Sequence, residues 1–121
     1  TIHAFIAAMN KGDIPAAAAT HVAAPSIIDE FPPHHWSGAT AFNDWLADFG
    51  KDSTARKVTD SKLIPHSAKR LTVEGDHAYV VMPTDYTFKQ GTKTMAEYGT
   101  ITYALDKTTA GWRIAAWSFS W

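Results

Sequence analysis

The sequence contains no cysteine, so disulfide bonds and cysteine-ligated zinc or iron–sulfur centres are excluded. It also lacks an excess of charge of either sign, because 11 Lys and Arg stand against 12 Asp and Glu and give a net charge of −1. Nucleic acids and anionic membranes attract proteins through basic patches, so we expect neither as a partner. No apolar stretch approaches the ~20 residues that span a bilayer. These absences favour an ordinary globular domain.

Hydrophobic residues make up 45% of the 121 positions, and a chain of this length buries roughly two thirds of the surface that it exposes when unfolded. We therefore expect one domain over residues 1–121. No targeting segment is visible, so the expected location is cytoplasmic. Because the sequence starts at Thr1 rather than Met, a processed or exported form stays open.

The first half of the chain has the three- and four-residue spacing of apolar side chains that is typical of amphipathic helices. This spacing predicts a first helix that ends at Gly12, because glycine readily takes the left-handed conformation that closes a helix. Asp13 is placed to cap a second helix that runs to about Pro25, and a short strand over Ser26–Phe31 follows. A third helix is expected over residues 37–50.

From residue 51 onward, the period changes to the two-residue alternation of strands. Because the connections are short, neighbouring strands are expected to pair antiparallel. Pro83 and Gly99 mark places where a bulge or kink could curve the sheet. Helices first and strands after predict an α+β fold in which the helices cover one face of an antiparallel sheet. The five expected strands are Arg56–Ile64, Ser67–Glu74, His77–Lys89, Thr92–Asp106 and Trp112–Trp121.

The last of these strands carries apolar side chains on both faces. Trp112 and Ile114 alternate with Trp117, Phe119 and Trp121, whereas a solvated sheet face would be polar. Clustered apolar residues on an outer face indicate an interaction surface. We therefore expect a homodimer that buries this face, and the alternative is a set of scattered exposed aromatic residues.

The stretch IIDEFPPHHWSGATAFNDW, residues 27–45, is preceded by Asn-Lys-Gly-Asp at residues 10–13. It resembles the nuclear transport factor 2-like superfamily, in particular its SnoaL-like and ketosteroid-isomerase-like branches, and the resemblance covers nearly the whole chain. The resemblance implies a cystatin-like cone, in which a curved antiparallel sheet wraps around about three N-terminal helices. It also implies a deep apolar pocket for a small hydrophobic molecule and a dimer through the outer sheet face.

Asp29 matches the position of the general base in the ketosteroid isomerases of this superfamily. The residues give an independent reason, because Asp29 lies between Ile27 and Phe31 on one face of the short strand. Apolar neighbours desolvate a carboxylate and raise its pKa, and such an acid could take a proton from a carbon acid or a bound water. The alternative is a carboxylate that caps the following turn or pairs with a cation.

The oxyanion donors of those isomerases are missing here. The first-helix Tyr falls on Phe5 and the second Asp falls near Ile101, so steroid isomerase activity is not expected. Glu97 and Tyr103 share the parity of Ile101 on their strand and could substitute, with core packing as the alternative for Tyr103. The residues expected to line the pocket are Phe5, Trp36, Tyr86, Glu97, Ile101, Tyr103 and Trp117.

His34 and His35 lie in the loop over the expected pocket mouth. His35 is a second candidate catalytic residue, a proton shuttle beside Asp29, because imidazole titrates near neutrality. The same Pro-Pro-His-His-Trp sequence is also typical of a rigid surface loop. A dehydratase or hydratase is a further possible function, because such an enzyme could use Tyr and His donors such as His35, His66, Tyr86 and Tyr103.

Two classes of function remain. No phosphate loop, nucleophile motif or metal-ligand spacing occurs, so we expect neither a cofactor nor a metal. The first class is a lyase, isomerase, cyclase or hydrolase that acts on a small hydrophobic molecule with Asp29 as acid or base. The second is a non-catalytic ligand-binding or dimerisation module. An open cavity in which Asp29 is near a second polar group favours the enzyme, and a filled interior favours the module.

Overall fold

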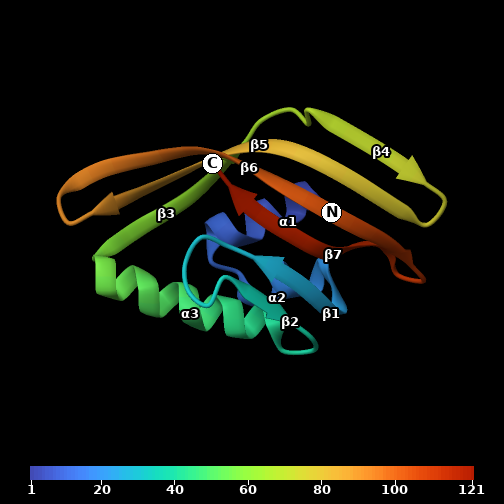
Figure 1. Cartoon of the computed structure of the whole chain (residues 1–121), viewed down its shortest axis with the longest axis horizontal. Coiled ribbons are helices and arrows are strands. Elements are labelled where there is room, and N and C mark those ends of the chain that lie inside the picture. Colours follow the sequence, from blue (N-terminus) through green and yellow to red (C-terminus); the bar gives the residue numbers. More distant parts are fainter.

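Three helices lie beneath one large curved sheet in the computed structural model, which describes residues 1–121 (Figure 1). The expected α+β class, with helices on one face of a curved sheet, is confirmed. The helices are α1 (Ile2–Lys11), α2 (Ile14–Ala19) and α3 (Ala41–Arg56). The strands are β1 (His21–Ile28), β2 (His35–Ser37), β3 (Val58–Pro65), β4 (Arg70–Glu74), β5 (His77–Gln90), β6 (Lys93–Thr108) and β7 (Gly111–Ser120).

The sheet is mixed rather than wholly antiparallel. Its strand order is β2-β1-β7-β6-β5-β3, and β1 runs parallel to β7. These two strands lie at opposite ends of the sequence, so the expectation drawn from short connections did not apply to them. The expected pairing of β3 with β4 is also wrong: β3 pairs with β5 from Thr84 to Gln90 and β4 pairs with it from His77 to Val81. The two strands therefore lie end to end along one edge of β5.

The second helix is shorter than predicted, because α2 ends at Ala19 and not near Pro25. Asp13 caps it as expected, accepting the backbone N–H of Ala16. At the other end, the side chains of Thr20 and His21 both bond to the carbonyl oxygen of Ala17. The chain then turns into β1, which covers residues that the sequence assigned to a helix.

The third helix and its surroundings also differ from the prediction. Gly50 does not end α3, which continues to Arg56 and closes on Lys57 in the left-handed conformation, with φ 59°. Strand β2 lies in a segment that was predicted to be a loop, and it pairs antiparallel with β1 through Ile28 and His35. The 29–34 turn between them sets the direction of Asp29.

A β-bulge interrupts the alternation of side chains that was predicted for β7. The register of β6 and β7 shifts between the Ala104–Ala116 and Leu105–Ile114 pairs, which leaves Ala115 without a partner. Ile114, Trp117 and Phe119 are therefore all buried on the inner, concave face, and Trp112 packs against the same core. Of the aromatic residues assigned to the outer face, Trp121 alone is strongly exposed.

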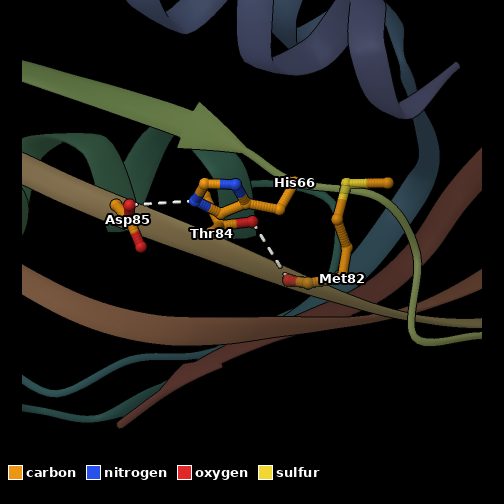
Figure 2. Close-up of polar contacts among 4 residues, drawn as sticks. All are labelled: His66, Met82, Thr84 and Asp85. Atoms are coloured by element: carbon orange, nitrogen blue, oxygen red, sulfur yellow. Dashed lines mark hydrogen bonds and ion pairs between the residues drawn. The ribbon is translucent and has the colours of Figure 1, made fainter.

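The strands approach closely at the middle of the sheet. A Cβ at Gly99 would lie 2.5 Å from the Phe119 ring, so only glycine fits beneath that ring. On β5, the fully buried hydroxyl of Thr84 donates to the carbonyl oxygen of Met82 at 3.0 Å (Figure 2). The concave face is thus well packed at its centre.

No helix combines the length and the apolar character needed to cross a membrane.

Candidate functional site

A cavity of about 390 Å³ lies between the helices and one end of the concave sheet face. This volume is within the range of small-molecule pockets. Fifteen of its 25 lining residues are hydrophobic. The aromatic residues in the wall are Phe5, Phe31, Trp45, Phe49, Tyr86, Phe88, Trp117 and Phe119. The interior is therefore open, which is the arrangement expected for a binding or catalytic pocket.

Asp29 directly follows β1 and lines this cavity. Its carboxylate accepts two hydrogen bonds, from the indole Nε1 of Trp45 to Oδ2 at 2.9 Å and from the backbone N–H of Glu30 to Oδ1 at 2.8 Å. Burial raises the pKa of Asp29 above its ordinary value, and these two bonds offset only part of the rise. Asp29 is therefore held in one orientation with an increased affinity for a proton.

Three more carboxyl groups line the cavity with Asp29: Asp52, which pairs with Arg56, and the two acids Glu30 and Glu97. Burial, together with hydrogen bonding and like charge from Glu97, raises the pKa of Glu30 to about 8. Glu97 stands on β6 opposite Tyr86 of β5, and its Oε2 atom is buried without a hydrogen-bond partner. The like charges of Glu30 and Glu97 favour a state in which this pair of carboxyl groups keeps a proton at neutral pH.

The two cationic side chains that line the cavity are engaged elsewhere. Arg56 pairs with Asp52 at 3.4 Å, and the Nζ of Lys62 donates to the backbone oxygen of Asn10 at 2.6 Å. The hydroxyl of Tyr86 is within 2.8 Å of the Ser61 hydroxyl. Asp29, Glu30 and Glu97 consequently have no cationic partner within the protein.

The structure brings together six of the residues that the sequence put forward for the site: Asp29, Phe5, Tyr86, Glu97, Ile101 and Trp117 line the cavity. Tyr103 does not line it. Its side chain is fully buried beside Phe5 in the filled part of the core, and its hydroxyl has no partner. Tyr103 thus lies on the same inner face of β6 as Glu97 and Ile101, but at a level of the strand where the core is filled.

Three other residues also lie outside the lining. Trp36 is buried against Phe31 and donates its indole N–H to Asp48 at 2.8 Å. His35 is exposed on β2, so the structure does not place it beside the Asp29 carboxyl as a shuttle would require. His66 is exposed and pairs with Asp85 at 2.9 Å (Figure 2).

Glu30 is the site residue that sequence reasoning missed. In an extended strand, the side chains of neighbours such as Asp29 and Glu30 point to opposite faces, so only one of them was expected in the pocket. The strand ends at Ile28, however, and the following turn directs both carboxyl groups into the cavity. The signal that could have found it is the acidic pair next to the Pro32-Pro33 turn.

Comparison with solved structures places this architecture among known folds. An NTF2-like protein with a cystatin-like fold from Novosphingobium aromaticivorans has a TM-score of 0.76 at 17% identity, over 98% of this chain and 75% of that one. An NTF2-like superfamily protein from Salmonella enterica serovar Typhimurium LT2 has a TM-score of 0.77 at 18% identity, over 98% and 84%. A ketosteroid isomerase-like protein from Erwinia carotovora atroseptica has a TM-score of 0.69 at 21% identity, over 98% and 88%. At these identities, the likeness establishes the fold.

The family follows from the sequence itself. The family model described as the SnoaL-like domain matches residues 1–121. The chain therefore belongs to the SnoaL-like domain family, within the NTF2-like fold, which confirms the resemblance given above. No curated protein sequence matches it significantly.

Proposed function

We propose that the protein is an enzyme, of the lyase, isomerase or hydrolase kind, that acts on a small hydrophobic molecule with Asp29 as its acid or base. The observation that carries this proposal is the setting of Asp29. It is a partly buried carboxyl, fixed by the Trp45 indole, that lines an open aromatic cavity together with the carboxyl groups of Glu30 and Glu97. A non-catalytic module has no need of such a group.

The chemistry assigned to Asp29 is proton transfer. As a carboxylate it can remove a proton from a carbon next to a carbonyl group, and as an acid it can return that proton to another atom of the same molecule. A raised pKa supports this role because the group's proton affinity moves closer to that of its reaction partner at neutral pH. The indole N–H of Trp45 keeps the other carboxyl oxygen in place during both steps.

Solvent exchange of carbon-bound protons tests this proposal. In D₂O, the wild-type protein is expected to exchange the α-protons of 2-tetralone or 4-phenyl-2-butanone, followed by NMR. Asp29→Asn keeps the size of the side chain, should leave the protein folded, and should slow exchange by roughly 10²–10⁴-fold, the usual contribution of a general base. Asp44→Asn, at an exposed position on α3, is the matched control and should behave as wild type. Equal rates for wild type and Asp29→Asn would contradict the proposal.

We also propose that the protein is a homodimer through the outer face of the sheet. On that face, β6 and β7 present small side chains such as Ala104, Ala116 and Ser118, beside the exposed rings of Tyr79 and Tyr98. Exposed aromatic residues gathered on one face are typical of subunit contacts.

Sedimentation at micromolar concentration tests the dimer. The expected species has about twice the 13.3 kDa mass of the chain. Ala104→Arg at the centre of the surface should yield the monomer, whereas Ala47→Arg on the exposed side of α3 should not. A wild-type monomer at that concentration would exclude the proposal.

A further inference from the structure

The cavity has a charge pattern that its apolar wall does not explain. Asp29, Glu30 and Glu97 all line it, and each of the first two has a pKa raised in part by the charge of a neighbouring carboxyl. No His lines the cavity, and its Arg and Lys are paired with other groups. Asp29, Glu30 and Glu97 have no cationic partner, and a buried carboxylate without one is costly, so a cavity that holds these three groups is suited to a ligand that supplies the missing positive charge.

Glu97 shows where this charge would be placed. The Glu97 carboxyl is hydrogen-bonded to the Glu30 carboxyl, but its Oε2 atom is inaccessible to solvent and has no donor from any other group. Glu97 also affects the other carboxyl groups, because it raises the pKa of both Asp29 and Glu30. A donor that reached Glu97 and Glu30 together would satisfy the orphaned oxygen and relieve their mutual repulsion.

The aromatic wall fits the same kind of ligand. Trp45 stacks on Phe49 with 5.5 Å between ring centres, and Tyr86 stacks on Phe88 with 4.8 Å. All four rings line the cavity that the carboxyl groups enter. Faces of Trp, Tyr and Phe attract cations, most strongly when the contact is desolvated, and they also bind an apolar body.

We propose that the molecule on which this site acts is an organic cation, an amine carried on an aromatic or other apolar body, whose ammonium group donates to Glu97 Oε2 and to the Glu30 carboxylate. The inference rests on the proposed function, and it divides the carboxyl groups by role. Glu30 and Glu97 hold the charge of the ligand, and Asp29 transfers the proton. The apolar body lies against the aromatic wall.

Binding of such a ligand should release a proton. In the empty site, the Glu30–Glu97 pair keeps a proton at neutral pH, whereas an ammonium group favours two carboxylates. The affinity for the amine should therefore rise with pH up to about 8, the value to which the pKa of Glu30 is raised, provided that the amine stays protonated. The affinity for a neutral ligand of the same shape should not rise.

Calorimetric titration with three matched probes tests this inference: 2-naphthylmethylammonium, 2-naphthylmethanol and 2-naphthoate. The amine is expected to bind about tenfold tighter than the alcohol, which corresponds to ~1.4 kcal/mol, and the acid should bind weakest. Titrations in buffers of different ionisation enthalpy should show that a proton leaves when the amine binds.

The variant Glu97→Gln should lose the preference for the amine but keep the binding of the alcohol. Glu74→Gln, which alters an exposed residue of β4, is the control and should retain the preference. Equal or tighter binding of the alcohol to the wild-type protein would overturn the inference, as would failure of all three probes to bind. Either result leaves the role of Asp29 to be decided by proton exchange, so the two proposals fail separately.

Discussion

The two ends of the concave sheet face differ in how their buried polar groups are paired. At the filled end, both ring nitrogens of His21 are bonded: Trp117 Nε1 donates to Nε2 at 3.1 Å, and Nδ1 donates to the carbonyl oxygen of Ala17 at 3.0 Å. At the open end, Glu97 Oε2 has no donor, and the pKa values of Asp29 and Glu30 are raised. One end contains a neutral imidazole with both nitrogens bonded, and the other contains a group of acids without a cationic partner.

This difference indicates that the polar groups at the filled end serve the stability of the fold and that those at the open end serve function. Buried polar groups that serve the fold are normally paired, because an unpaired one costs free energy. Tyr103 is the exception at the filled end, but its hydroxyl is neutral and carries no charge to compensate. Carboxyl groups left without a cationic partner next to a cavity are better explained by a ligand than by the fold.

Trp45 connects the two ends, and its removal should have the largest effect on stability. The ring is buried, contacts Trp117 edge-on and donates to Asp29. Trp45→Ala should lower the free energy of unfolding by about 3–5 kcal/mol, the usual cost of deleting a buried large aromatic side chain. Denaturant unfolding measures this loss. A change below about 1 kcal/mol would show that Trp45 contributes little to the core.

A milder change at the same position separates packing from polarity. Trp45→Phe keeps a ring but removes the N–H that Asp29 accepts, and that bond holds the pKa of Asp29 down. The variant should therefore raise the pKa of Asp29 further. An unchanged pKa would mean that the indole does not control this carboxyl.

The filled end should lose stability in acid. Burial lowers the pKa of His21 below its ordinary value of 6.5, so the unfolded chain binds this proton before the folded one as the pH falls. The contribution of His21 is then complete above pH 6.5 and declines below it. His21→Gln cannot take up a proton, so the pH dependence of its unfolding free energy between 7 and 5 should be weaker than that of wild type. Parallel profiles would contradict this account of His21.

The open end should show the opposite sign. The folded state keeps the Glu30 proton up to about pH 8, whereas the unfolded chain releases it near 4.5. This group therefore makes the protein less stable as the pH rises through that window. Glu30→Gln should be more stable than wild type at pH 8 and equal to it near pH 4. A variant that is less stable at pH 8 would indicate that Glu30 has a favourable partner.

The fold was largely predictable from the sequence, because periodicity depends on local spacing. The change from helical to strand spacing gave α1 and the two long strands β5 and β6 almost to their observed bounds. Features that depend on distant partners were not predictable. The parallel pairing of β1 with β7 and the bulge at Ala115 arise from contacts between segments that lie far apart or in irregular register.

The candidate site was predictable only in part, for the same reason. Asp29 could be placed from its apolar neighbours and from the family resemblance, and Glu97 from its parity on a long strand. Glu30 required the geometry of the turn after Ile28, which no spacing rule contains. Tyr103 had the right parity but the wrong position along the strand, since the core is filled at that level.

Site-specific titration of the carboxyl carbons by NMR tests the central claim, that the acids at the open end lack a cationic partner. The account predicts a midpoint for Asp29 above its ordinary value of 3.8, and one for Glu30 near 8. In Glu97→Gln, the midpoint of Glu30 should move down toward 4.5, because the neighbouring acid is gone. Midpoints of Asp29 and Glu30 at or below 3.8 and 4.5 in the wild-type protein would identify paired carboxylates and would contradict the account.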